Sequence, residues 1–167
     1  MTSEVSYRVR PCTRADALVL RALRLEALRD TPDAYGSTFE ESVRWSRERW
    51  EEMASTFNYF LAETDGDVVG MVSGGGNDRH PGTFWMYAMY VTPDARGSGV
   101  ATQLVEAVSQ WARERGADEL YLHVTTAVAR ARAFYRKVGF REIGEAIAMD
   151  RDPSLQLVTM VRNLYER

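Results

Sequence analysis

The sequence has one cysteine, little net charge and no long apolar run, and each of these features excludes a class of protein. Cys12 is the single cysteine, so a disulfide within the chain is excluded. The N-terminal segment MTSEVSYRVRP lacks the apolar core of a signal peptide or a membrane span, and we therefore expect a cytoplasmic location. The formal net charge of -3 provides no general attraction for nucleic acid or for an anionic membrane.

The composition is that of an ordinary soluble globular protein, with 45% hydrophobic and 27% charged residues. A length of 167 residues is typical of one domain with a substantial core. No repeat or low-complexity linker interrupts the chain. We therefore expect a single domain over residues 1–167.

The first third of the chain predicts one strand and two helices. Residues 5–11 alternate as a strand, with Val5, Tyr7 and Val9 on one face. Residues 13–30 predict a helix that opens with a Thr13/Asp16 capping box. The helix places four apolar residues on one stripe, namely Leu18, Ala22, Leu25 and Leu28. A second helix is expected over residues 39–54, with Trp45 and Trp50 as packing residues.

The remainder alternates between strands and helices. Residues 57–64, 68–75 and 84–92 predict an antiparallel meander, whose first hairpin turns at the Asp-Gly-Asp sequence. A helix from Val100 to Gly116 has buried positions at helical spacing, followed by a strand at 119–125 and a helix at 128–139. Two final strands are expected at 140–149 and 155–164. The order predicts an α/β (α+β) fold: a mixed, mostly antiparallel sheet of about seven strands with about four helices on its faces.

A glycine turn separates the third meander strand from the helix at Val100. Backbone N–H groups at a helix start lack intrahelical partners and carry the positive end of the helix dipole, so they can hold an anion. Gly97 and Gly99 leave this backbone accessible, Ala101 keeps the next turn small, and Arg96 adds a donor fork suited to phosphate. A pyrophosphate fits these features. The alternative is that the glycines only shape a tight strand-to-helix turn.

Two other nucleotide-binding motifs fit poorly. A Walker P-loop needs a lysine followed by a serine or threonine after its second glycine, and these are missing at that spacing. A dinucleotide fingerprint needs glycine or alanine where Thr102 stands, and it belongs in an opening βαβ unit.

Two motifs resemble the GCN5-related N-acetyltransferases (GNAT). RGSGVA, residues 96–101, matches that family's [QR]-x-x-G-x-[GA] pattern, and AFYRKVGF, residues 133–140, is similar to its tyrosine-bearing helix and following strand. The opening helix and the late TMVRNL strand also resemble the family, so the resemblance extends over nearly the whole chain. It implies a GNAT-like fold and transfer of acetyl from acetyl-CoA to a primary amine of a small molecule or peptide, by direct attack in a ternary complex.

The resemblance also implies where acetyl-CoA binds. The pyrophosphate would rest on the glycine turn, and the pantetheine arm would pair with the strand before it. The cofactor-binding residues are then Met89, Tyr90, Val91, Arg96, Gly97, Ser98, Gly99, Val100, Ala101 and Thr102. Val128 stands where the family often has an asparagine that contacts the arm, so Thr125 or Thr126 would have to replace that contact. Four basic residues are candidates for the 3′-phosphate, although at least two of them are expected on a solvated helix face: Arg130, Arg132, Arg136 and Lys137.

The resemblance assigns Tyr135 as the acid that protonates the departing thiolate; the alternative is a core tyrosine. The strand at 84–92 lacks the glutamate that often serves as base. Glu40, Glu41 and His123 are the candidates to replace it, against the alternatives of a solvated helix face for the glutamates and a packing role for the histidine. His80 is expected at the surface, Cys12 is assigned no chemistry, and no metal site is expected.

Other functions remain open at this point. A non-catalytic CoA-binding or regulatory protein of the same fold is one alternative. Val128 and the missing strand glutamate favour it, whereas Tyr135 and the intact glycine turn argue against it. Nucleic-acid binding is disfavoured by the acidic pI of about 5.5. Four aromatic residues could build a wall beside acidic groups: Tyr35, Phe39, Trp85 and Tyr87. Such a wall suits a polyamine, an amino acid, an antibiotic amine or a peptide N-terminus, and the sequence does not choose among them. A homodimer is possible by analogy with similar proteins.

Overall fold

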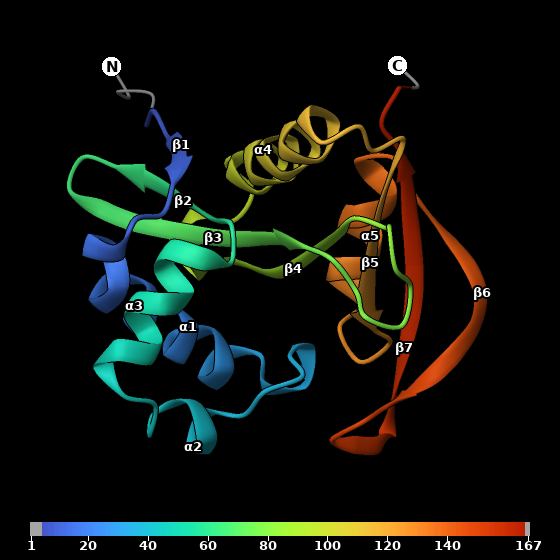
Figure 1. Ribbon diagram of the computed structural model, residues 1–167, viewed down its shortest axis with the longest axis horizontal. Coiled ribbons are helices and arrows are strands. Elements are labelled where there is room, and N and C mark those ends of the chain that lie inside the picture. Colours follow the sequence, from blue (N-terminus) through green and yellow to red (C-terminus); the bar gives the residue numbers. More distant parts are fainter. Residues whose placement is uncertain (1–4, 166–167) are drawn as a thin grey trace.

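The computed structural model describes residues 5–165, which form one seven-stranded mixed sheet flanked by helices (Figure 1). The strands are β1 Arg8–Pro11, β2 Tyr59–Thr64, β3 Asp67–Gly75, β4 Trp85–Val91, β5 Glu119–Thr125, β6 Phe140–Met149 and β7 Asp152–Asn163. The α-helices are α1 Ala17–Asp30, α2 Phe39–Ser42, α3 Arg47–Thr56, α4 Val100–Glu114 and α5 Ala129–Lys137. Three 3₁₀ turns are η1 Arg14–Asp16, η2 Pro32–Ala34 and η3 Pro93–Ala95.

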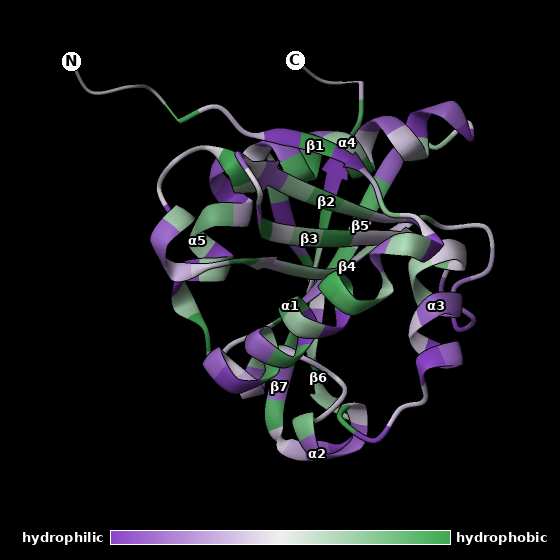
Figure 2. Ribbon diagram, turned by 90° about the vertical axis from the view of Figure 1, so that its left-hand side faces the viewer, coloured by the Kyte–Doolittle hydropathy of each residue, from purple (hydrophilic) through white to green (hydrophobic). Residues whose placement is uncertain are grey.

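The sheet order is β1-β2-β3-β4-β5-β7-β6, and β4 and β5 are parallel while the other neighbours are antiparallel. The predicted meander and the mixed, mostly antiparallel sheet are therefore confirmed. Helices α4 and α5 pack on one face, and α1 and α3 pack on the other. Figure 2 shows that these helices carry both hydrophobic and hydrophilic residues, as helices that cover a sheet on one side must. Within residues 5–165, no helix has the length and apolar character needed to cross a membrane.

The first strand is shorter than predicted. It begins at Arg8, which pairs with Glu63, and Val5 is 58% exposed. Its partner β2 ends at Thr64, which lies opposite Tyr7 in this register, so residues 5 and 6 have no strand to pair with.

The buried face of α1 also differs from the predicted stripe. Of the predicted stripe, Leu25 and Leu28 are buried, but Leu18 is 61% exposed and Ala22 is exposed. The face against the sheet is formed by Ala17, Leu20, Leu23 and Ala27. Both stripes have helical spacing, so periodicity alone could not choose between them. Packing against Leu61 and Met71 of the sheet selects the second.

The predicted helix over residues 39–54 is two helices, α2 and α3. Each has its own N-cap: the Thr38 hydroxyl accepts from the Glu41 N–H at 3.3 Å, and the Ser46 hydroxyl accepts from the Arg49 N–H at 3.2 Å. Ser46 has extended backbone, which interrupts the helix. Trp50 is 1% exposed and lies 5.0 Å from Trp45 between ring centroids, as expected of packing residues.

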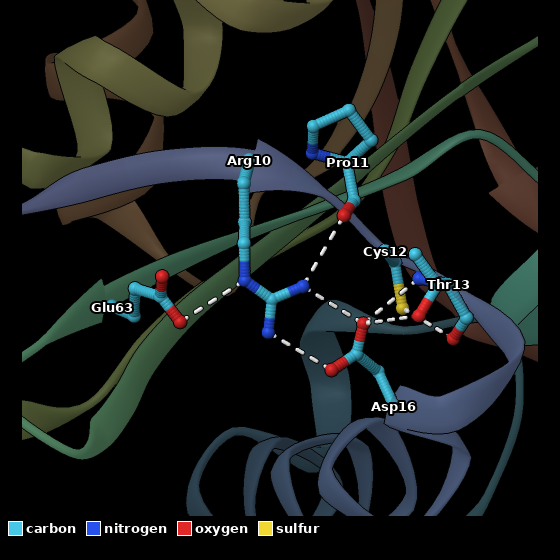
Figure 3. Close-up of polar contacts among 6 residues, drawn as sticks. All are labelled: Arg10, Pro11, Cys12, Thr13, Asp16 and Glu63. Atoms are coloured by element: carbon cyan, nitrogen blue, oxygen red, sulfur yellow. Dashed lines mark hydrogen bonds and ion pairs between the residues drawn. The ribbon is translucent and has the colours of Figure 1, made fainter.

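An ion cluster attaches the start of α1 to the sheet (Figure 3). Arg10 binds both carboxylate oxygens of Asp16, at 2.8 and 2.9 Å, and Glu63 at 3.0 Å. Asp16 also accepts from the backbone N–H of Thr13, so the predicted capping box exists. The Arg10 hydrogen bonds lower the pKa of Asp16 to about 2. Burial raises the pKa of the adjacent Cys12 thiol to about 12, so it remains protonated and a poor nucleophile at neutral pH.

The contact between Gly74 and Trp111 provides a test of the packing between β3 and α4. A Cβ at Gly74 would lie 2.6 Å from the Trp111 ring, whereas one at Gly76 would meet nothing within 4 Å. We expect Gly74→Ala to lower the free energy of unfolding by about 1–3 kcal/mol through overpacking, and Gly76→Ala to change it much less. Urea denaturation measures both, and equal stabilities would show that Trp111 can move aside freely.

Candidate functional site

The site begins where β4 and β5 separate. These parallel strands share one paired step, Trp85 opposite Tyr121, supported by the Tyr121 N–H donating to the Phe84 carbonyl at 2.9 Å. Beyond it β4 contains a bulge, because the register with β3 shifts between Met71 and Ser73, and Ala88 has a φ of 56°. A bulge bends its strand and ends regular pairing. The facing edges of the two strands therefore diverge and open a cleft.

The cleft consists of two connected hollows. The outer one, about 430 Å³, lies against the glycine turn, and the inner one, about 280 Å³, extends to His123. Six residues line both hollows and so mark their junction: Ala34, Tyr35, Met89, Val128, Ala131 and Tyr135.

The glycine turn forms the wall of the outer hollow. Gly97 and Gly99 have φ of 81° and 89°, which favours glycine, and a Cβ at either would meet nothing within 4 Å. The turn therefore presents its backbone to open space at the start of α4, a helix of 15 residues. Of the ten predicted cofactor-binding residues, all but Ser98 line this hollow; the Ser98 hydroxyl instead donates to the Ala95 carbonyl.

Arg96 has structural partners as well as a place in the hollow. Its guanidinium donates to the Val91 carbonyl at 3.1 Å and to Asp30 at 2.6 Å, and it lies 5.7 Å from the Tyr90 ring centroid. The hydrogen bond from Arg96 lowers the pKa of Asp30, so the carboxylate stays charged at neutral pH. Arg96 thus fastens the end of α1 to the glycine turn.

The basic residues of α5 divide into two pairs. Arg132 and Arg136 both bind Glu142 on β6, with the shortest Arg132 contact at 2.8 Å. Arg130 and Lys137 instead line the outer hollow. Two of the four candidates, Arg130 and Lys137, therefore line the cleft. The other two, Arg132 and Arg136, lie on the outer face of the helix, where at least two of the four were expected.

Tyr135 lies at the junction of the hollows with 8% of its surface exposed. Its ring packs against Phe134 and Phe140, at 5.4 and 5.7 Å between centroids. Burial raises the pKa of its phenol, which is therefore protonated at neutral pH. Nearby, the Tyr35 hydroxyl donates to the Met89 carbonyl at 2.9 Å and holds the η2 segment against the β4 bulge.

His123 lies where the inner hollow meets a third hollow of about 400 Å³, whose other lining residues are 76–79, Tyr87, Ile147, Ala148, Asp150 and Leu157. Leu122 and Val124 are buried in the core on the opposite face of β5, as the alternation predicted. The His123 Nδ1 lies 3.2 Å from the Thr159 hydroxyl on the neighbouring strand. Burial, followed by the positive charges of His80 and Arg79, lowers the His123 pKa, so the imidazole is neutral at pH 7.

The other candidate residues lie outside these hollows or at their edges. Glu40 and Glu41 are exposed on α2 and line none of the three. Of the predicted aromatic wall, Tyr35 and Tyr87 line the inner hollow, whereas Trp85 is buried and does not line it. Phe39 lies 4.3 Å from the Arg29 guanidinium on α1.

The two threonines proposed to replace the missing asparagine differ in position. Thr125 is 2% exposed and lines the inner hollow, but its hydroxyl accepts from the Ala127 N–H at 3.2 Å. Thr126 is exposed and does not line the cleft. His80 is exposed, as expected, and stacks 5.8 Å from Trp85. Among the described residues, no group of three or more His, Cys, Asp or Glu is placed to hold a metal ion.

Comparison with known proteins identifies the family. A family model described as "Acetyltransferase (GNAT) family" matches residues 21–140, which is most of the chain. The chain belongs to the GNAT acetyltransferase family. Among curated relatives in this family, a mycothiol acetyltransferase of Thermobispora bispora is 32% identical over 71% of this chain and 41% of its own length. An uncharacterized N-acetyltransferase, YjgM of Escherichia coli, is 28% identical over 77% of this chain and 85% of its own length.

Solved GNAT structures have the same fold. A putative acetyltransferase from Salmonella typhimurium, yncA, solved with its cofactor acetyl-CoA, superposes with a TM-score of 0.72 at 20% identity, covering 97% of this chain and 96% of that one. The ribosomal-protein-alanine N-acetyltransferase of Brucella melitensis gives 0.70 at 26% identity, covering 93% and 99%. The chain spans less than half the length of the mycothiol acetyltransferases that it matches.

Some contacts in this GNAT cleft have no local signal in the sequence. Thr159 is 36 residues from His123, and Met89 is 54 residues from Tyr35. Only the pairing of β5 with β7, and the packing of η2 on β4, bring them together.

The neutral state of His123 can be measured directly. We expect its imidazole to titrate below 6.5, and NMR of the two histidines, assigned with His80→Gln, reports this midpoint. Because the unfolded chain binds the proton more readily, the His123 contribution to stability is present above pH 6.5 and decreases as pH falls below it. His123→Gln should therefore flatten the acid side of the stability profile. A midpoint above 6.5 would contradict this assignment.

Proposed function

We propose that this protein transfers the acetyl group of acetyl-CoA to a primary amine, by direct attack of the amine within a ternary complex. The observation that carries the proposal is the continuous cleft from the open glycine turn, past Tyr135, to His123. This cleft connects the backbone amides of the glycine turn, which suit an anion, to the protonated phenol of Tyr135 and the neutral imidazole of His123. Since the chain spans only part of several relatives, the activity of the whole protein is included in this proposal.

The residues of the outer hollow fit acetyl-CoA. The turn amides and the positive end of α4 suit a pyrophosphate, and Arg130 and Lys137 supply cations for a further phosphate. The diverging edges of β4 and β5 leave room for an extended arm with amide groups. When bound there, acetyl-CoA supplies an activated thioester carbonyl.

His123 is the best-placed base. Its neutral imidazole lies between the inner hollow and the third hollow. The Thr159 hydroxyl can accept from Nδ1–H, leaving Nε2 to accept a proton from the amine. The exposed Glu40 and Glu41 would need to act through water over a longer path. As the amine nitrogen bonds to the acetyl carbon, the C–S bond breaks and the amine loses one proton.

Tyr135 is the best-placed acid for the thiolate that leaves. A thiol has an ordinary pKa near 8.5, below that of a buried phenol, so donation to a free thiolate is uphill. Transfer of the Tyr135 proton must therefore accompany C–S cleavage. This balances the reaction: His123 takes one proton and Tyr135 gives one.

A non-catalytic CoA-binding protein is the second candidate. Val128 lines the cleft where the family often has an asparagine, and the inner hollow has no acidic lining residue. Consumption of acetyl-CoA in the presence of a panel of amines separates the two functions.

Gly99→Val tests cofactor binding. Its side chain would adopt a strained positive φ and project into the outer hollow, so we expect CoA affinity to fall about tenfold or more, or about 1.4 kcal/mol. Gly116→Val is the matched control, because Gly116 has a φ of 82° and equally open surroundings but lies outside the cleft. Calorimetry with CoA compares the folded variants. Equal affinities would remove the glycine turn from the binding site.

Single-turnover acetyl transfer tests the two proton transfers. We expect Tyr135→Phe and His123→Gln each to slow it by roughly 10²-fold with CoA binding retained, the scale of general acid–base catalysis. Glu40→Gln and Glu41→Gln should leave the rate near that of the parent. If Glu40→Gln or Glu41→Gln slowed the reaction while His123→Gln kept the rate of the parent, the base would be a glutamate of α2 and not His123.

A further inference from the structure

The cleft edge of β4 carries backbone groups that pair with no other strand of the described sheet. The Thr92 N–H donates to the Val69 carbonyl on β3 at 2.8 Å, and the residues of a strand alternate in the side to which both their N–H and C=O point. The backbone of Met89 and Val91 therefore faces away from β3. Because β4 and β5 are paired at Trp85 and diverge after it, this edge faces the cleft.

Side chains occupy both carbonyls of this edge. The Tyr35 hydroxyl donates to the Met89 carbonyl at 2.9 Å, and the Arg96 guanidinium donates to the Val91 carbonyl at 3.1 Å. The N–H groups of the same two β4 residues lie on the same edge. The edge therefore offers hydrogen-bond donors to a ligand, while its acceptors are satisfied within the protein.

The Tyr35 contact lies next to the strained residue of the bulge. Ala88 precedes Met89 and has a φ of 56°, a left-handed conformation that a residue with a Cβ keeps only where neighbouring contacts hold it. Tyr35 can provide such a contact, since burial raises the pKa of its phenol and keeps it a donor at neutral pH. The loop that follows Tyr35 is itself held, because Arg24 of α1 donates to the Ser37 hydroxyl at 2.9 Å.

We propose that Tyr35 is a positioning residue for acetyl transfer, which fixes the β4 bulge so that the N–H groups of the cleft edge meet the thioester oxygen of acetyl-CoA. This inference rests on the proposed function. As the amine attacks, negative charge develops on that oxygen, and preorganised N–H donors stabilise it. A carbonyl left free on the same edge would repel this charge and could turn with the bulge. The Tyr35 hydroxyl prevents both by binding the Met89 carbonyl, and so it acts through the backbone of β4.

Tyr35→Phe tests this role, because it keeps the ring and removes only the hydroxyl. We expect single-turnover acetyl transfer to slow roughly tenfold, less than on loss of a direct oxyanion donor, while acetyl-CoA affinity stays within about twofold. Tyr121→Phe is the matched control, since it removes a tyrosine hydroxyl that donates to the Glu119 carboxylate at 2.9 Å, and Tyr121 lines none of the three hollows. The acceptor is the fastest amine of a panel that contains phenylethylamine, lysine and spermidine.

Infrared spectroscopy of bound acetyl-CoA, isotopically labelled at the acetyl carbonyl, separates positioning from packing. Hydrogen bonds to a carbonyl oxygen weaken its double bond, so the stretching frequency should fall when acetyl-CoA binds to the parent protein. In Tyr35→Phe this shift should be smaller, whereas Tyr121→Phe should keep the parental shift. Lost packing alone would leave the frequency of the bound carbonyl unchanged.

The two measurements distinguish failure of the positioning role from failure of the proposed function. A folded Tyr35→Phe protein with the parental carbonyl frequency refutes the positioning role, whether its transfer rate is parental or lower, and leaves acetyl transfer standing. If the parent binds acetyl-CoA but acetylates none of the amines, catalysis fails, and a frequency shift that depends on the Tyr35 hydroxyl still upholds the arrangement of the β4 edge. An equal shift in the parent and in Tyr35→Phe refutes that arrangement as well.

Discussion

The opening between β4 and β5 depends on one parallel backbone step, Trp85 opposite Tyr121. Trp85 is almost fully buried, and its ring stacks 5.3 Å from Tyr121 and lies 4.6 Å from His123. This contact holds the strands together at one end, while the bulge at Ala88 bends β4 away at the other. If β4 and β5 stayed paired along their whole length, the sheet would have no cleft, and the glycine turn would face a closed surface.

Burial sets the protonation states along the cleft. It raises the pKa of Tyr135 and lowers that of His123, so one group keeps its proton and the other stays free of one at neutral pH. Arg132 and Arg136 are held by Glu142 on the outer surface. Arg96, Arg130 and Lys137, by contrast, line the outer hollow.

The two ends of the cleft are mechanically connected through one aromatic residue. Arg151 binds the backbone of Tyr35, and the hydroxyl of Tyr35 binds the Met89 carbonyl at the β4 bulge. The β6–β7 hairpin therefore contacts β4 through a single intervening residue. Loss of either hydrogen bond would loosen the η2 segment, which lies between the two hollows.

Short-range patterns were sufficient for much of this protein. The meander and the α4 stripe were predicted because strand alternation and helical spacing act over a few residues, and both are confirmed. The role of Gly97 and Gly99 in the turn before α4 also followed from the sequence, because the positive φ that the turn requires is a property of single residues that favours glycine. The family followed from two motifs whose order and spacing are also linear properties.

Contacts between distant segments decided the rest. Periodicity offered two faces for α1, and packing against Leu61 and Met71 chose the one without Leu18. Four basic residues on α5 looked equivalent until Glu142 paired with two of them. The sequence offered both Glu40 and His123 as candidate bases, and only the fold put the histidine in the cleft and the glutamate outside it. Each choice depends on a partner from another element, and the sequence alone does not state which elements meet.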